Sequence, residues 1–166
     1  MWRRALIGRR PKRTLARIVV LVVTAFVLTR FVFLPIRVDG GSMLPTYKEH
    51  GVNFVNRLAY LFHEPRRGDV VAIRLADQSV MFPQILYMKR IVGLPGETIA
   101  FHEGHALING SILHEPYVKY DCDWERTPVT LGPGQYFVVG DNRNMPIEDH
   151  TMGEPHRNRI LGKILL

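Results

Sequence analysis

The sequence predicts a mainly β protein, in which one N-terminal transmembrane helix carries a domain of coiled antiparallel β-sheets. Two observations support this prediction. A long apolar segment follows a basic N-terminus, and the later hydrophobic runs are short and bounded by turn residues. No later segment shows a long helical period. The predicted boundaries are a basic tail over residues 1–17, an anchor over 18–35 and a β-rich domain over 36–166.

The apolar segment has the length of a membrane-spanning helix. Residues 18–34 are apolar except for Thr24, Thr29 and Arg30. A helix from about residue 14 to residue 34 reaches the roughly 20 residues that cross a bilayer. The basic residues before it predict a cytoplasmic tail, a β-rich domain outside the membrane and the lipid bilayer as a partner. A cleavable signal segment and a buried core helix are the alternatives, and no small-x-small cleavage motif follows the segment.

The formal net charge of +7 is confined to the N-terminus. Seven Arg and Lys residues stand within the first seventeen positions, and the remainder has fifteen basic and fifteen acidic residues. No basic patch interleaved with aromatic residues is present, which argues against a nucleic-acid partner. The single Cys122 excludes an internal disulfide and a cysteine-based zinc site. The sequence makes no prediction of oligomeric state.

The hydrophobic runs after the anchor predict strands. These runs are 52–55, 69–73, 85–92, 98–101, 106–108 and 135–139. Asn109-Gly110 is the strongest hairpin signal. Gly96 follows Leu94-Pro95 and is expected to take a positive φ. Residues 58–62 are apolar and long enough for one or two helical turns.

The segment GGSMLPT, residues 40–46, contains a candidate nucleophile, Ser42. Alternation in an extended chain places Ile36, Val38 and Gly40 on the same strand face as Ser42. Two preceding glycines open the backbone to an approaching peptide and leave the Ser42 N–H available to a developing oxyanion. Taken alone, the tripeptide Gly41-Ser42-Met43 also occurs in ordinary loops.

Lys89 is the candidate base. It follows an apolar run that predicts a buried strand, with Tyr87 and Lys89 on one face and Met88 on the other. Desolvation lowers a lysine pKa by several units, and the resulting neutral amine can take a proton from a hydroxyl. The alternative is an ordinary lysine that faces solvent. Arg90 is expected to be such a solvent-facing residue or a partner in an ion pair.

Four ordered motifs resemble those of the type I signal peptidases. They are GSMLPT at 41–46, KRIVGLPGE at 89–97, the Asn-Gly hairpin followed by EPY at 115–117, and GDNR at 140–143. The resemblance covers nearly all of the chain after the anchor. It implies a membrane-bound serine endopeptidase of the bacterial cytoplasmic membrane that removes signal peptides from exported precursor proteins. Ser42 would be the nucleophile and Lys89 the general base, and no cofactor or metal is implied.

The resemblance also implies where the substrate lies. An extended segment with small residues at −1 and −3 would add between the serine strand and the lysine strand by β-augmentation. The candidate walls of its pockets are Ile36, Val38, Tyr87 and Met88. The residues expected to support the catalytic pair are Gly40, Met43, Asp141, Asn142, Arg143, Asp149 and His150.

The segment after GDNR departs from the family pattern, which resembles xxSxDSR. This chain has NMPIEDH at 144–150, so Pro146 replaces the hydroxyl that would orient the lysine amine. His150 replaces the arginine, and Asp149 and His150 are expected to rebuild a polar network. The residue two positions before the nucleophile is Gly40, so a side-chain donor to the oxyanion is absent there.

Other interpretations stay open at this point. The departure fits a specialised relative with few clients, or a catalytically silent scaffold that binds precursors. A metal site at His102, Glu103 and His105 lacks an HExxH motif and converging carboxylates. A Ser/His/Asp triad through His150 and Asp149 explains less of the sequence. A self-cleaving repressor would carry a DNA-binding domain and lack the anchor.

Overall fold

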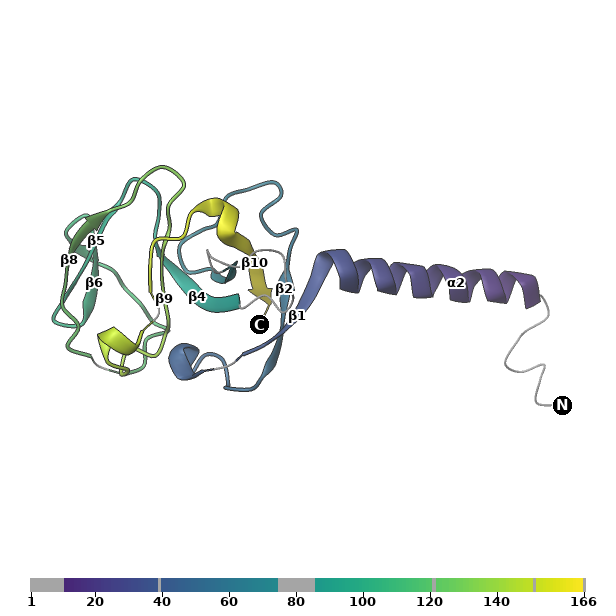
Figure 1. Ribbon diagram of the computed structural model, residues 1–166, viewed down its shortest axis with the longest axis horizontal. Helices are drawn as coiled ribbons and strands as arrows, with labels where there is room; N and C mark the ends of the chain where they lie inside the picture. Colours follow the sequence, from purple (N-terminus) through teal and green to yellow (C-terminus); the bar gives the residue numbers. More distant parts are fainter. Residues whose placement is uncertain (1–10, 39, 75–85, 121, 151, 166) are drawn as a thin grey trace.

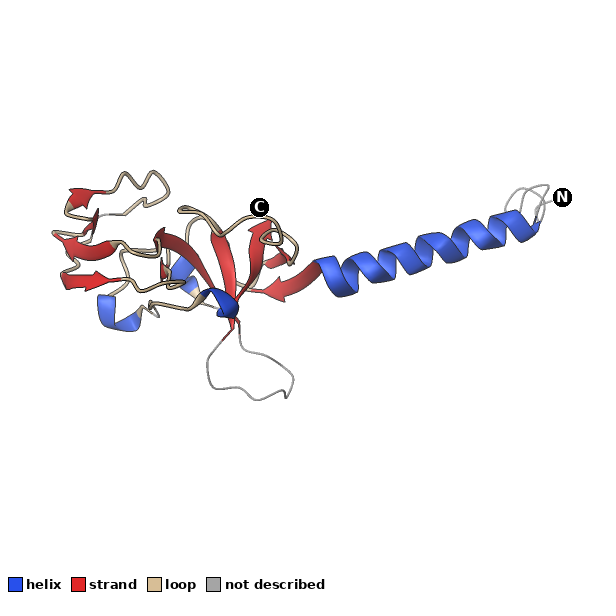
Figure 2. Ribbon diagram, turned by 90° about the horizontal axis from the view of Figure 1, so that it is seen from above, coloured by secondary structure: helices blue, strands red, loops and turns tan. Residues whose placement is uncertain are grey.

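The computed structural model describes residues 11–38, 40–74, 86–120, 122–150 and 152–165. One long helix projects from a β-rich body and meets it at the first strand (Figure 1). Two antiparallel sheets form this body, so the predicted mainly β fold with one N-terminal apolar helix is confirmed. Figure 2 shows the strands gathered at one end of the molecule and the helix extending from them.

The N-terminal helix is apolar and uncovered by the β-rich body. Helix α2 spans Pro11–Val27 and continues as a π-helical turn, η1, over Leu28–Val32. The span Pro11–Val32 contains an 18-residue stretch with a mean hydropathy of 2.2, and none of the span is buried. Its 22 residues reach about 33 Å at 1.5 Å per residue, which matches a bilayer core. The predicted helical end at residue 34 is wrong, because strand β1 already begins at Phe33. Leu34 precedes Pro35, and the α conformation is disfavoured for a residue that precedes proline.

The larger sheet holds the serine and lysine segments. Its strand order is β1-β2-β10-β3-β4-β9, and each neighbouring pair is antiparallel. The smaller sheet, ordered β7-β6-β5-β8, lies at the end remote from the helix (Figure 1). The strands of the larger sheet are β1 (Phe33–Arg37), β2 (Val52–Asn56), β3 (Val70–Arg74), β4 (Leu86–Gly93), β9 (Phe137–Val139) and β10 (Ile160–Leu165). Those of the smaller sheet are β5 (Thr98–His102), β6 (His105–Ile108), β7 (Ser111–Ile112) and β8 (Arg126–Thr130).

Most predicted strands are present within two residues of their expected bounds. Asn109-Gly110 turns β6 into β7, and Gly96 has a φ of 84°, as predicted. Residues 58–62 form turns and bends instead of a helix. Residue 85, the start of one predicted strand, lies outside the described residues. Strand β1 overlaps the extended strand that was predicted to contain Ile36, and β7 is the second strand of the predicted Asn-Gly hairpin, whereas β8 and β10 were not predicted.

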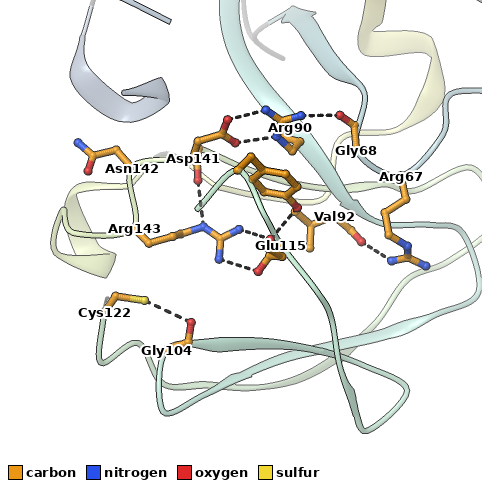
Figure 3. A network of polar contacts seen from close by, with 12 residues as sticks. Arg67, Gly68, Arg90, Val92, Gly104, Glu115, Cys122, Asp141, Asn142 and Arg143 are labelled. Atoms are coloured by element: carbon orange, nitrogen blue, oxygen red, sulfur yellow. Dashed lines mark hydrogen bonds and ion pairs between the residues drawn. The ribbon is translucent and has the colours of Figure 1, made fainter. Parts of the chain in front are cut away.

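A buried ion pair joins the two sheets. Arg143 is 1% exposed, and its guanidinium donates to both carboxylate oxygens of Glu115, at 2.6 and 3.2 Å. Figure 3 shows Arg143 beside Glu115. The Arg143 Nε donates to the carbonyl of Gly140, and the guanidinium lies 5.3 Å from the ring of Phe101 in β5. A buried charge of this kind is tolerated because each of the three guanidinium nitrogens donates to a partner.

We predict that Glu115→Gln destabilises the protein by about 3–5 kcal/mol, because it leaves the buried Arg143 charge uncompensated. The matched control is Glu64→Gln. Glu64 also accepts from an arginine and a tyrosine, but its side chain is 72% exposed, and its substitution should cost about 1 kcal/mol or less. Urea unfolding of the two variants in detergent measures both values. Equal stability of the two variants would contradict the structural role of the Glu115–Arg143 pair.

Candidate active site

Ser42 lies in a short turn, and its predicted place at the end of a strand is wrong. Strand β1 ends at Arg37, and the 3₁₀ turn η2 covers Gly41–Met43. Gly40 takes a φ of 99°, which breaks the alternation of an extended chain. A side chain disfavours this backbone conformation, so glycine suits position 40. The turn directs the Ser42 side chain toward β4 and the amine of Lys89.

Lys89 and Ser42 are brought together as the sequence predicted. The Nζ atom of Lys89 lies 2.6 Å from Ser42 Oγ, and Lys89 is only 3% exposed. Lys89 stands in β4 opposite Val71 of β3, well inside the larger sheet. In the described part of the chain, Ser42 is the one hydrogen-bond partner that Lys89 Nζ has. The contact joins a hydroxyl to a buried amine at hydrogen-bonding distance.

Two opposing effects set the pKa of Lys89. Burial disfavours the charged ammonium and lowers the pKa from its ordinary value near 10.5 to about 8. The negative charge of Asp141 acts in the opposite direction and raises the pKa. Burial is the larger effect, so a substantial fraction of neutral amine exists near pH 8.

Asp141 is held by a bidentate ion pair with Arg90, the residue that follows the candidate base. Arg90 donates from Nε to Oδ1 at 2.8 Å and from Nη2 to Oδ2 at 2.6 Å (Figure 3). Thr46 donates to the same carboxylate at 2.6 Å. Arg90 is therefore an ion-pair partner, the second of its two predicted roles. The sequence analysis did not identify Thr46, although it lies within the GSMLPT motif.

The turn at residues 140–142 packs directly against the nucleophile turn. The backbone N–H of Asn142 donates to the Ser42 carbonyl, and its side-chain amide donates to the Gly41 carbonyl, both at 3.0 Å. A Cβ atom on Gly140 would lie 2.1 Å from the Ser42 carbonyl oxygen. Because that oxygen is backbone, it cannot move aside as a flexible side chain would. The close approach explains the glycine of GDNR.

A small cavity of about 40 Å³ adjoins the pair. Ile36, Val38, Tyr87 and Met88 all line it, together with Ser42 and Lys89. Strand β9 pairs only with the second half of β4, from Arg90 onward. Among the described strands, none covers the edge of residues 86–89 that faces away from β3. The described strands therefore leave the edge of residues 86–89 unpaired, and the small recess lies beside it.

The supporting residues expected from the sequence differ in their placement. Met43 is 1% exposed and belongs to the apolar cluster that contains Val38 and Met88. His150 is buried and bonds to the Asn142 carbonyl. Asp149 is exposed on η3 (Ile147–Asp149), and its carboxylate makes no hydrogen bond within the described part of the chain, so its expected role in a network with His150 is wrong.

The sequence of this chain is similar to those of known signal peptidases. Residues 12–166 match the family model described as signal peptidase, peptidase S26. Signal peptidase I of Leptolyngbya laminosa is 33% identical over 149 residues, which cover 87% of this chain and 73% of that protein. Signal peptidase I T of Bacillus subtilis is 36% identical over 156 residues, covering 87% and 78%. Signal peptidase I V of the same organism is 32% identical over 160 residues, covering 88% and 92%.

A solved structure gives a weaker likeness. The crystal structure of a signal peptidase I from Enterococcus faecalis has 25% sequence identity and a TM-score of 0.49, and the match covers 61% of this chain and 97% of that chain.

We predict that Lys89 titrates near pH 8 and that Asp141→Asn lowers its pKa further. The substitution removes the charge that raises the Lys89 pKa and keeps an oxygen that can accept from Arg90. NMR titration of the Lys89 side chain with isotopically labelled lysine measures both values. Asp123→Asn, at an exposed position, is the matched control and should leave the Lys89 pKa unchanged. A Lys89 pKa near 10.4 in the unsubstituted protein would contradict the argument.

Proposed function

Because the chain belongs to the signal peptidase family, peptidase S26, and has signal peptidase I activity, we propose that Ser42 is its nucleophile and Lys89 its general base. The observation that carries this proposal is the 2.6 Å contact between Ser42 Oγ and the buried Lys89 amine. A neutral amine at this distance can accept the hydroxyl proton, and burial keeps a fraction of Lys89 neutral near pH 8.

The reaction follows from the position of these two groups. Neutral Lys89 takes the proton of Ser42 as Oγ attacks the carbonyl carbon of the substrate, which forms a tetrahedral intermediate. The Lys89 ammonium then gives that proton to the leaving amine as the peptide bond breaks and an ester to Ser42 forms. Water hydrolyses the ester with Lys89 again as base, which releases the carboxylate product and restores the Ser42 hydroxyl.

The substrate in this proposal is the extended segment that precedes the cleavage site of an exported precursor. Its backbone would pair with the free edge of β4 at residues 86–89 by β-augmentation. A cavity of about 40 Å³ accepts a methyl group more readily than a larger side chain, which supports small residues at −1 and −3. Ile36, Val38, Tyr87 and Met88 would form the walls.

The apolar helix supports a membrane-bound enzyme. In this proposal residues 1–17 form a cytoplasmic tail, residues 18–35 an anchor in the bacterial cytoplasmic membrane, and residues 36–166 a domain on its outer side. The signal segment of a precursor is itself apolar and lies in the same bilayer. Confinement to one surface raises the effective concentration of the cleavage site near Ser42 without additional contacts.

We predict that Ser42→Ala and Lys89→Met each lower cleavage of a precursor by at least about 10³-fold, because each removes a participant in proton transfer and attack. The assay uses the full chain in detergent with a labelled precursor that carries an Ala-x-Ala site. Ser111→Ala and Lys119→Met are the matched controls at exposed positions outside the site and should retain activity.

The pH dependence is part of the same prediction. Because Lys89 acts when deprotonated, cleavage should rise as pH increases through about 8 and level off above it. A wild-type chain that binds the precursor without cleaving it would favour the silent scaffold. Retained activity in Lys89→Met would exclude Lys89 as the base.

We predict that Ile36→Ala broadens the substrate preference at the cleavage site. Shortening this half-buried side chain enlarges the cavity beside Ser42, so a precursor with Val in place of Ala at −1 should be cleaved about tenfold or more faster than by the wild type. The measurement is the ratio of kcat/KM for the two precursors. Ile112→Ala, at a position 68% exposed, is the control. An unchanged ratio would remove Ile36 from the pocket.

A further inference from the structure

His150 is a buried ring beside the turn that carries the GDNR motif. It is 5% exposed and lies edge-on to Trp124, with 4.7 Å between ring centroids. The Nε2 atom is 2.9 Å from the carbonyl oxygen of Asn142. Its Cε1 atom lies 2.5 Å from the position that a Cβ on Gly140 would occupy, so the ring fits against the glycine backbone.

The hydrogen bond fixes the tautomer of His150. A carbonyl oxygen only accepts, so Nε2 must carry the proton that bonds to Asn142. Nδ1 is buried and has no hydrogen-bond partner in the described part of the chain. Burial lowers the pKa of His150 to about 4, and the positive charges of Lys89 and Arg143 act in the same direction. The bond to Asn142 acts in the opposite direction and is the smaller effect, so the ring is neutral at the pH at which Lys89 works.

Asn142 connects this ring to the nucleophile. Its carbonyl accepts from His150, while its N–H and its side-chain amide hold the carbonyls of Ser42 and Gly41. All three contacts are between 2.9 and 3.0 Å long. Rotation of the Asn142 backbone would therefore displace the turn that carries Ser42, and the hydrogen bond from His150 opposes that rotation.

We propose that His150 is a positioning residue whose neutral Nε2–H holds Asn142 and, through it, keeps Ser42 Oγ within reach of Lys89. The inference rests on the proposed roles of Ser42 and Lys89. Pro146, where the family pattern has a hydroxyl, offers no donor and is exposed. Lys89 Nζ has Ser42 as its one hydrogen-bond partner among the described residues, so the geometry of the pair depends on how firmly the serine turn is held.

Three substitutions separate the hydrogen bond from the packing of the ring. His150→Phe keeps a ring against Trp124 and removes the donor. In His150→Asn the side-chain amide is too short to reach the Asn142 carbonyl. In His150→Gln the amide nitrogen can take the place of Nε2 and donate to that carbonyl. Steady-state cleavage of the labelled precursor by the full chain gives kcat and KM separately, and urea unfolding reports folding. The control is His102→Phe, because the side chain of His102 is 68% exposed.

We expect His150→Phe and His150→Asn to lower kcat about 10- to 100-fold with KM within about twofold, because a small displacement of a reacting group has an effect of this size. His150→Gln should retain kcat within about threefold. Wild-type kcat in all three variants would overturn the proposal. A parallel loss of kcat and of the unfolding midpoint in all three would also overturn it, since the ring would then act only by packing. Failure of the wild type to cleave would instead reject the proposed function.

Discussion

The buried ion pair between Arg90 and Asp141 is the interaction on which the rest of the site depends. Asp141 is fully buried and receives hydrogen bonds from Arg90 in the lysine strand and from Thr46 just after the serine turn. One carboxylate therefore ties together the two segments that supply the reacting groups. The pair also has an electrostatic consequence. An unpaired Asp141 near Lys89 would favour the ammonium form of Lys89. The Arg90 guanidinium opposes this effect, because its positive charge lies beside the Asp141 carboxylate.

Each residue of the GDNR motif has a separate physical role in the structure. Gly140 allows the backbone to approach the Ser42 carbonyl more closely than any side chain would permit. Asp141 joins the lysine strand to the segment just after the serine turn, and Asn142 holds the carbonyls of that turn. Arg143 reaches in the opposite direction, where it pairs with Glu115 between the sheets (Figure 3). The motif thus connects the turn that carries Ser42 with the ion pair between Arg143 and Glu115.

Local sequence patterns predicted the fold class, and the four ordered motifs singled out Ser42 and Lys89, but neither predicted the geometry between these two residues. Strands β3 and β4 are short runs rich in β-branched and apolar residues, a pattern that predicts buried strands. Strand β8 was missed because it contains Pro128 and lies at the edge of its sheet, where proline is tolerated. The placement of Ser42 was wrong because alternation assumes an extended backbone, and the positive φ of Gly40 ends it. The contacts of Asp141 and His150 join residues that the chain brings together only after folding, so no local pattern reveals them.

The departure after GDNR changes which side of the catalytic pair receives support. A hydroxyl at position 146 would hold the lysine amine, but proline stands there, and the hydrogen bonds of the described residues converge on the carbonyls of Gly41 and Ser42 instead. In the proposed mechanism, support of the serine is sufficient, since proton transfer depends on the distance between Oγ and Nζ and not on which partner is fixed. The amine is confined by burial in a packed strand, and the serine turn is held by the hydrogen bonds from Asn142. The histidine at position 150 is neutral, and it donates one hydrogen bond to the Asn142 carbonyl without placing a further charge near Lys89.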